Sequence, residues 1–134
     1  MLFAACKGEP VKGSAAANPA AESKEVSPAE AQVAVSQAYS QFIDVRTPEE
    51  YAAGHAARSE NIPLDTLNAN LNKLYKKDPV YIICQTGNRS KKAGQILKDA
   101  GFNQVMNITG GTVAWQAANL PMETRAPHNI PKKD

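Results

Sequence analysis

Residues 80–97, VYIICQTGNRSKKAGQIL, decide the fold of this chain. Residues 80–83 are a continuous apolar run, largely β-branched, which is typical of a parallel strand covered on both faces. A polar turn that contains glycine follows at 84–89. After it, apolar residues recur as one helical face: Ala93, Ile96, Leu97 and Ala100. A buried strand, a short turn and a helix in this order predict an α/β domain with a parallel sheet.

Strand and helix patterns alternate on both sides of this stretch. Ser27-Pro28-Ala29-Glu30 combines an N-cap residue, a first-turn proline and a capping-box glutamate, so we expect a helix from Ser27 to about Tyr39. The other expected elements are a strand over 41–45, a short helix from Pro48 that Gly54 closes, a strand at 61–62, leucines at helical spacing over 64–74, a strand over 104–108, and a helix from Gly110-Gly111 that stops at Leu120-Pro121. Strands that alternate with helices imply helices on both faces of the sheet.

The 134 residues divide into one domain with a flexible segment at each end. Residues 7–26 are rich in Ala, Pro, Ser, Gly, Lys and Glu and offer almost nothing to bury, which is linker composition. We therefore expect a tether or signal remnant over 1–26, a domain over 27–121 and a flexible tail over 122–134.

Composition excludes several classes of protein. The hydrophobic fraction of 43% supports a core, while the aromatic fraction of 6% leaves packing to aliphatic side chains. The formal net charge is only +2, and no basic run is interleaved with aromatic residues, so we expect no nucleic-acid partner. No stretch approaches the about 18 apolar residues of a membrane span.

The two cysteines, Cys6 and Cys84, are too few for a disulfide framework. Neither has a cysteine or histidine neighbour at metal-ligand spacing, so no metal site is expected. A disulfide between them stays open for an oxidising compartment, although Cys6 lies in the linker-like segment.

Cys84 is the candidate catalytic residue. It follows a buried parallel strand at the carboxyl edge of the sheet, where open α/β sheets bind their ligands. The unpaired amides and the dipole of the next helix favour an anion there, and so favour a thiolate. An inert structural cysteine is the alternative, but the next five residues are polar or glycine. The candidate binding residues of the loop are Gln85, Thr86, Gly87, Asn88, Arg89 and Ser90.

Two of these loop residues have particular roles in this hypothesis. Gly87 lets the backbone turn so that the amides converge, and Arg89 supplies a fixed positive fork for an oxyanion. Asp44 and Arg46 end a neighbouring strand and are supporting candidates. Their simpler interpretation is structural: Asp44 caps nearby amides and Arg46 pairs locally. We expect His55 to be a buried, hydrogen-bonded residue and Trp115 to be core.

Five short motifs, in this order along the chain, resemble the signatures of the rhodanese homology domain. They are Ile43-Asp44-Val45-Arg46-Thr47-Pro48-Glu49-Glu50-Tyr51, Gly54-His55, Asn61-Ile62-Pro63, Cys84-x-x-Gly87-x-Arg89-Ser90 and Gly110-Gly111-x-x-Ala114-Trp115. The resemblance covers residues 27–121. It implies a five-stranded parallel sheet between helices, in the order 3-2-4-5-1, and a catalytic loop from Cys84 to Arg89.

The resemblance also implies an activity, that of a thiosulfate sulfurtransferase. Sulfane sulfur would pass from a thiosulfate-like donor to a thiol, a thioredoxin-like protein or cyanide through a persulfide on Cys84, without a metal or organic cofactor. Related phosphatases and arsenate reductases use Cys-x5-Arg, whereas Cys84-x4-Arg89 is the shorter, sulfur-handling form. A persulfide carrier with little turnover of small donors, and a phosphatase or arsenate reductase, remain the alternatives. The chain departs from the family at Arg58, where glycine is common.

The first seven residues, MLFAACK, resemble the end of a bacterial lipoprotein signal, in which small residues precede a lipid-modified cysteine. The resemblance implies a lipid on Cys6, anchoring to a membrane, and a location in the periplasm or cell envelope. A cytoplasmic protein is the alternative.

Overall fold

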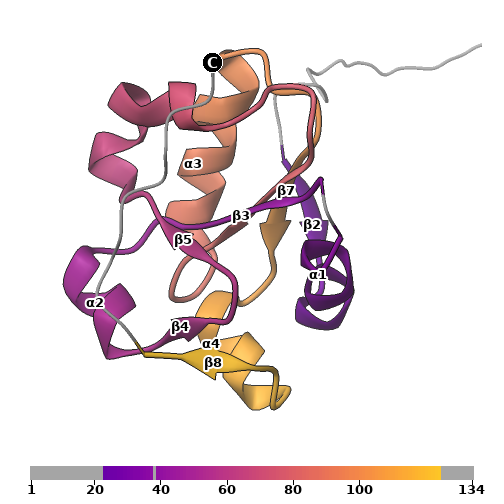
Figure 1. The fold of residues 1–134 in the computed structure, drawn as a ribbon, viewed down its shortest axis with the longest axis vertical. Coiled ribbons are helices and arrows are strands. Elements are labelled where there is room, and N and C mark those ends of the chain that lie inside the picture. Colours follow the sequence, from indigo (N-terminus) through magenta and orange to yellow (C-terminus); the bar gives the residue numbers. More distant parts are fainter. Residues whose placement is uncertain (1–22, 38, 125–134) are drawn as a thin grey trace, which may run out of the picture.

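The fold is α/β, as a computed structural model that describes residues 23–37 and 39–124 shows (Figure 1). In chain order the elements are β2 (Lys24–Val26), α1 (Pro28–Val35), β3 (Gln41–Asp44), α2 (Pro48–Ala53), β4 (His55–Ala56), β5 (Glu60–Asn61), the 3-10 helix η3 (Leu64–Lys73), β6 (Val80–Ile83), α3 (Asn88–Asp99), β7 (Val105–Ile108), α4 (Gly111–Ala117) and β8 (Met122–Glu123).

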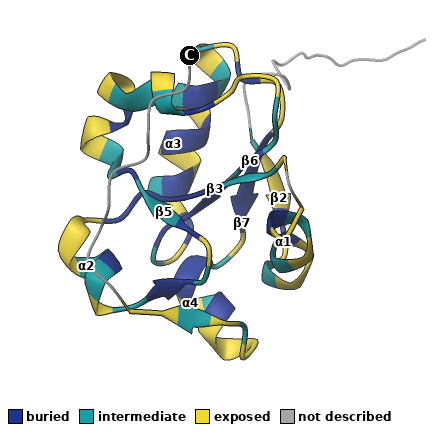
Figure 2. Cartoon of the chain, viewed as in Figure 1, coloured by how far each residue is buried: buried dark blue, intermediate teal, exposed yellow. Residues whose placement is uncertain are grey.

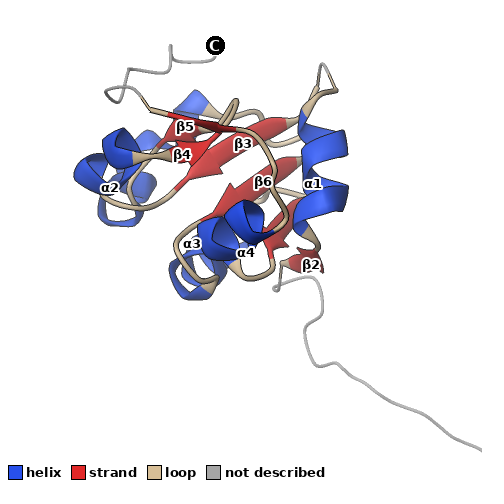
Figure 3. Cartoon of the chain, turned by 90° about the horizontal axis from the view of Figure 1, so that it is seen from below, coloured by secondary structure: helices blue, strands red, loops and turns tan. Residues whose placement is uncertain are grey.

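The central sheet has five parallel strands in the order β2-β7-β6-β3-β5. Numbered along the chain and read from the β5 edge, this order is 3-2-4-5-1, so the expected topology is confirmed. Figure 3 shows β5, β3 and β6 side by side. The strand ahead of Cys84, β6, is central and pairs with β3 on one side and β7 on the other.

Two hydrophobic clusters cover the two faces of the sheet, because alternate strand residues point to opposite sides. One cluster joins Ile82 of β6 to Leu97 of α3 and Leu67 of η3. The other joins Ile83 of β6 to Ala31 of α1 and Trp115 of α4. In Figure 2 the central strands are buried and the outer sides of the helices are exposed. The end of β6, where the loop begins, is therefore packed on both faces.

Capping boxes start α1 and α2. The hydroxyls of Ser27 and Thr47 accept hydrogen bonds from the amides of Glu30 and Glu50, and each glutamate side chain accepts one from the amide of its N-cap residue. These contacts satisfy amides that have no partner inside the helix. The helix starts expected at these two positions are confirmed.

The structure corrects the expected boundaries at both ends of the domain. Residues 24–26, assigned to the tether, form edge strand β2 and pair with β7. Residues 122–123, assigned to the tail, form β8, which pairs antiparallel with β4. Both strands are too short to show a hydrophobic alternation, and their stability comes from backbone pairing with distant segments.

Two helices also differ from the expectation. The first ends at Val35 rather than near Tyr39; the Ser36 hydroxyl donates to the carbonyl of Val33 and helps to terminate it. Leu64, Leu67 and Leu71 lie on a 3-10 helix that is kinked at Asn70, and Leu74 follows its end in an extended conformation. No helix within the part of the chain that the structure describes has the length and apolar character needed to cross a membrane.

Candidate active site

Cys84 follows the last residue of β6 and lies at the carboxyl edge of the sheet, with 1% of its surface exposed. The amide of Gly87 donates a hydrogen bond to its Sγ atom at 3.0 Å, and Ser90 Oγ lies 3.4 Å from Sγ. The sulfur is therefore enclosed by the first turn of the loop and of α3.

Two opposing effects act on the pKa of the Cys84 thiol. Burial raises it, because desolvation disfavours the thiolate. The hydrogen bond between the thiol and the Ser90 hydroxyl, and hydrogen bonds from the amides of Ser90, Gly87 and Thr86, lower it, and together they outweigh burial. The pKa of Cys84 lies below its ordinary value of 9.0, as expected for a thiol that is prepared to react as a nucleophile.

The loop turns into α3 at Gly87, whose φ of 109° is a left-handed conformation that side chains rarely adopt. This turn directs the amide of Gly87 to the sulfur. The twelve residues of α3 then begin at Asn88, so the positive end of the helix dipole faces the loop.

The other side of the loop is held by the start of α4. Thr112 donates to the carbonyl of Cys84 through its amide at 2.8 Å and its hydroxyl at 3.0 Å, and the amide of Val113 donates to the carbonyl of Gln85. A Cβ on Gly111 would lie 2.4 Å from the Cys84 carbonyl oxygen, so only glycine allows this approach. The start of α4 thus hydrogen-bonds the carbonyl groups of Cys84 and Gln85. The amides of the loop can then face the sulfur.

Arg89 lies at the end of the loop, but its guanidinium is already paired. It donates to both carboxylate oxygens of Glu50 on α2, at 2.7 and 3.0 Å. About a third of each side chain is exposed. Glu50 was not among the residues singled out from the sequence, because its motif also explains it as a helix cap. In the structure Glu50 both completes the capping box of α2 and pairs with Arg89.

Asp44 and Arg46 form a buried ion pair, and the amide of Arg46 donates to Asp44 Oδ1 at 2.9 Å. Arg46 also donates to the carbonyl of Gly54 at 2.7 Å and to Gln85 Oε1 at 3.3 Å. The local capping and pairing expected of these two residues are confirmed. The pair contacts the catalytic loop through the side chain of Gln85.

The remaining loop candidates differ in exposure. The side chains of Thr86 and Asn88 are exposed, and Ser90 is buried. Cys6, the candidate for lipidation, lies outside the described residues. Within the described residues, no group of three or more His, Cys, Asp or Glu side chains could hold a metal ion.

A chain of hydrogen bonds behind the loop was missed by sequence reasoning. Ser90 Oγ contacts Asn107 Oδ1, and Asn107 Nδ2 donates to Glu25 Oε2 at 2.7 Å. Thr109 Oγ1 donates to the other oxygen of Glu25 at 2.8 Å. The one available signal was a polar residue, Asn107, in the otherwise apolar strand VMNI.

His55 and Trp115 have the structural roles expected of them. His55 is fully buried; its ring stacks on Tyr51, and its Nδ1 lies 2.7 Å from the Tyr51 carbonyl. Trp115 packs in the core and donates from Nε1 to the carbonyl of Pro121 at 2.8 Å.

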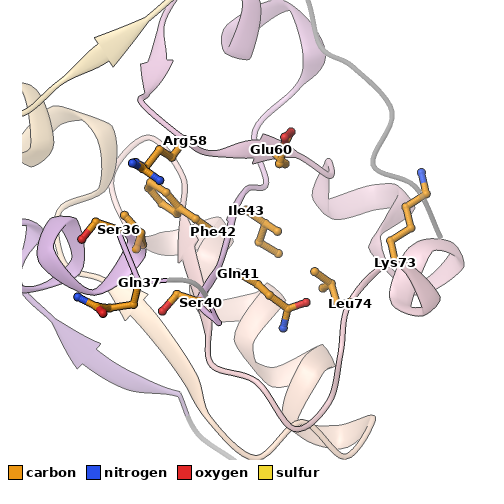
Figure 4. A pocket seen from close by; sticks show the side chains of 11 residues that line it. Ser36, Gln37, Ser40, Gln41, Phe42, Ile43, Arg58, Glu60, Lys73 and Leu74 are labelled. Carbon is orange, nitrogen blue, oxygen red and sulfur yellow. The ribbon is translucent and has the colours of Figure 1, made fainter. Parts of the chain in front are cut away.

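Of two cavities in the domain, one borders the catalytic loop and the other does not. A cavity of about 320 Å³ lies beside the start of β3, between the side chains of Phe42, Arg58 and Leu74 (Figure 4). None of its lining residues belongs to the loop 84–90. A second cavity, of about 300 Å³, is lined by Arg89 together with Val45, Arg46, Thr47, Pro63, Leu64 and Asp65. The second cavity therefore borders the catalytic loop at Arg89.

Comparison with known proteins gives consistent findings. A family model described as "Rhodanese-like domain" matches residues 27–118. The chain is 40% identical over 75 residues to "Uncharacterized protein YqhL" of Bacillus subtilis (strain 168), covering 56% of this chain and 60% of that protein. It is 38% identical over 74 residues to "Putative sulfur carrier protein YrkF" of the same organism, covering 55% of this chain and 40% of that protein. The match therefore spans less than two thirds of either relative.

A solved structure matches this chain over nearly the whole of its own length. The crystal structure of a rhodanese-like domain protein from Staphylococcus aureus is 33% identical, with a TM-score of 0.68. The similarity covers 77% of this chain and 99% of that chain.

Proposed function

Because this chain belongs to the rhodanese-like domain family, we propose that it transfers sulfane sulfur through a persulfide on Cys84. The observation that carries the proposal is the position of the Cys84 sulfur: it ends a central parallel strand, starts a six-residue loop, and accepts the amide of Gly87 at 3.0 Å. This arrangement stabilises a thiolate, which is the nucleophile in covalent catalysis by cysteine.

In the first half-reaction, the Cys84 thiolate attacks the outer sulfur of a thiosulfate-like donor. The new bond joins Sγ to the outer sulfur, the bond between the two donor sulfurs breaks, and sulfite leaves with the electron pair. In the second half-reaction, a thiolate or cyanide attacks the outer sulfur of the persulfide, and the Cys84 thiolate is released. No net electrons are gained or lost by the protein over the cycle, so no redox cofactor is needed.

The loop supports this cycle through its amides. The pKa of the Cys84 thiol is lowered by the hydrogen bonds of Ser90, Gly87 and Thr86 against the opposing effect of burial. The same amides can receive the negative charge of the outer sulfur once the persulfide forms. A carbonyl oxygen facing the sulfur would oppose that charge, and the Thr112 contact turns the Cys84 carbonyl away.

The experiment that tests the proposal is intact-mass measurement after incubation with thiosulfate. One added sulfur atom on the wild-type protein, absent from Cys84→Ala, supports it. A protein that gains no sulfur from thiosulfate, from a low-molecular-weight persulfide or from a cysteine-desulfurase-type donor contradicts it.

A second candidate function is a persulfide carrier that receives sulfur from a partner protein. The pairing of Arg89 with Glu50 favours it, because a guanidinium already held by a carboxylate is a poorer receptor for a small anionic donor. A relative named as a sulfur carrier points the same way. A carrier would accept one sulfur in the mass experiment but show little thiosulfate:cyanide turnover.

The proposed location is the bacterial periplasm or cell envelope, with a lipid on Cys6. The sequence around Cys6 is the support for this proposal, since residues 1–22 lie outside the described part of the chain.

A further inference from the structure

Asn107 is a polar residue with no exposed surface in the middle of β7, between the catalytic loop and the edge strand β2. Its amide side chain joins Ser90 on α3 to Glu25 on β2. A buried amide must satisfy its hydrogen bonds with protein groups, and these contacts do so. The mechanism described above makes no use of it.

The Glu25 carboxylate determines which way the Asn107 amide faces. An ionised carboxylate only accepts hydrogen bonds, so the group 2.7 Å from Glu25 Oε2 has to be the amide NH2. The amide oxygen of Asn107 then faces Ser90. That oxygen carries no hydrogen, so the Ser90 hydroxyl has to be the donor in their close contact.

A hydroxyl has one hydrogen, and three acceptors surround the Ser90 oxygen. Besides Asn107 Oδ1 they are the Gly87 carbonyl at 3.1 Å and the Cys84 sulfur at 3.4 Å. When the hydrogen points to Asn107, the Ser90 oxygen presents a lone pair to the sulfur. It can then accept a hydrogen bond from the Cys84 thiol but cannot donate one to the thiolate.

We propose that Asn107, oriented by Glu25, is a positioning residue that takes the hydrogen of the Ser90 hydroxyl and so turns the Ser90 oxygen toward Cys84 as an acceptor. The inference rests on Cys84 being the reacting sulfur. It assigns to Asn107 and Glu25 the task of holding back ionisation of Cys84: the full stabilisation of the thiolate by Ser90 requires the hydroxyl to leave Asn107.

This restraint fits the chemistry of sulfur transfer. A thiol whose pKa is too low ionises readily but becomes a weaker nucleophile, and the best attacking thiol has a pKa near the working pH. The Ser90 hydroxyl and the loop amides lower the pKa of Cys84. The contact of Asn107 with Ser90 opposes the part of this lowering that the hydroxyl supplies.

The charged groups near this hydrogen-bond chain come from three elements. Glu25 lies on β2, Lys91 of α3 lines the same hollow as Glu25, and Arg89 of α3 is paired with Glu50 of α2. Neither β7 nor α4 carries a charged residue. Because Glu25 is itself charged, the experiment must separate its effect through Ser90 from its direct electrostatic effect on Cys84.

The test is the pH dependence of Cys84 alkylation by iodoacetamide, which requires no sulfur transfer, in a double-mutant cycle. Asn107→Leu removes the acceptor at similar volume, Ser90→Ala removes the hydroxyl, and the third variant combines them. With Ser90 present, Asn107→Leu should lower the midpoint by about one pH unit and speed alkylation about tenfold well below it, as expected for one more hydrogen bond to a charged group. In the Ser90→Ala protein, Asn107→Leu should have no effect.

A second substitution keeps the test decisive if Asn107→Leu does not fold. Glu25 is exposed, and Glu25→Lys presents a donor that turns the Asn107 oxygen away from Ser90. It should lower the midpoint by more in the wild-type background than in the Ser90→Ala background, where only the direct effect of the charge remains. Equal shifts in the two backgrounds, no shift, or a raised midpoint would overturn the proposal for whichever variant folds. The proposed sulfur transfer would be untouched by that outcome, because the mass experiment decides it separately.

Discussion

The guanidinium of Arg89 donates to both carboxylate oxygens of Glu50, at 2.7 and 3.0 Å, and so connects the end of the catalytic loop to α2. The side-chain hydrogen bonds of Arg89 lower the pKa of Glu50 from 4.5 to about 2, with burial acting in the opposite direction. The same pair raises the pKa of Arg89. The charged form of Arg89 is therefore stabilised, and its guanidinium is held in place by Glu50.

Glu50→Gln should make folding stability less dependent on pH in the acid range. A pKa that is lowered in the folded state contributes stability above the ordinary value of 4.5 and loses it as the pH falls toward about 2. The side chain is about a third exposed, so screening limits the contribution to about 0.5–1 kcal/mol. Urea unfolding should show this loss at pH 7 and no difference from wild type near pH 2. Glutamine can still complete the capping box.

Glu49→Gln is the matched control, because Glu49 is an exposed neighbour on the same turn of α2. A pH dependence changed equally by both substitutions would mean that general charge on α2, rather than the Arg89 pair, sets the acid stability.

Arg89→Ala should weaken the use of thiosulfate more than it weakens folding. If a donor anion displaces Glu50 from Arg89, the charge-assisted hydrogen bond is worth about 1.5–3 kcal/mol in the transition state, or roughly ten- to a hundredfold in kcat/KM. Glu50→Gln should act in the opposite direction and raise kcat/KM for thiosulfate, because it frees the guanidinium. Steady-state assays with thiosulfate and cyanide measure both. Unchanged kcat/KM in Arg89→Ala would show that Arg89 is only structural.

Cys84→Ala should abolish both the added sulfur and thiosulfate:cyanide turnover, because the nucleophile is missing. Cys6→Ser should leave the activity of the soluble protein intact. In a bacterium that expresses the full natural leader, Cys6→Ser should instead release the protein from the membrane fraction. Residual turnover by Cys84→Ala above trace levels contradicts the mechanism. Membrane partitioning that is the same in Cys6→Ser and in the wild-type protein contradicts the lipid anchor.

Gly111→Ala should destabilise the domain by about 2–4 kcal/mol and impair sulfur transfer. The new Cβ would lie 2.4 Å from the Cys84 carbonyl oxygen, and φ at this position is +60°. Gly54→Ala is the control, since a Cβ there meets only Met122 at 3.8 Å. Urea unfolding and the sulfur-transfer assay measure the two effects. Equal stability of the two variants would mean that the close contact between α4 and the loop is not needed.

The parts of the fold that could be predicted are those with local signals. The apolar run of β6, the capping boxes at Ser27 and Thr47 and the left-handed turn at Gly87 are each encoded within a few residues. Strand β2 was missed because three residues at a sheet edge are defined by their partner β7, about 80 residues away, and not by their own pattern.

The same distinction holds for the site: its local part could be predicted from the sequence, and its contacts with distant segments could not. The loop from Cys84 to Ser90 follows from a strand, a turn and a helix in sequence. The groups that control it come from elsewhere: Glu50 from α2, Thr112 from α4, and Asn107 from β7. Each has an ordinary structural explanation in its own segment, so its contact with the loop appears only when the chain is folded.

We expect the length of the loop to determine the choice between sulfur and phosphate chemistry. The loop of six residues from Cys84 to Arg89 should be too tight to surround a phosphate or arsenate with amide donors at about 2.9 Å while Cys84 stays in line for attack. It has room for one more sulfur atom, because the Gly87 amide already reaches Sγ at 3.0 Å. The wild-type protein should therefore hydrolyse aryl phosphates no faster than Cys84→Ala.

Insertion of one glycine after Gly87 should reduce sulfur transfer, because the widened loop no longer brings the amides together on the persulfide. Glycine is the appropriate insertion, since it tolerates whatever dihedral angles the larger turn requires. A matched glycine insertion after Gly101, in the exposed turn between α3 and β7, controls for general destabilisation. Thiosulfate:cyanide turnover and aryl-phosphate hydrolysis measured on the three proteins decide the matter. If the insertion after Gly87 leaves sulfur transfer at the level of the control insertion, or if the wild-type protein hydrolyses aryl phosphates through Cys84, then loop length does not select the substrate.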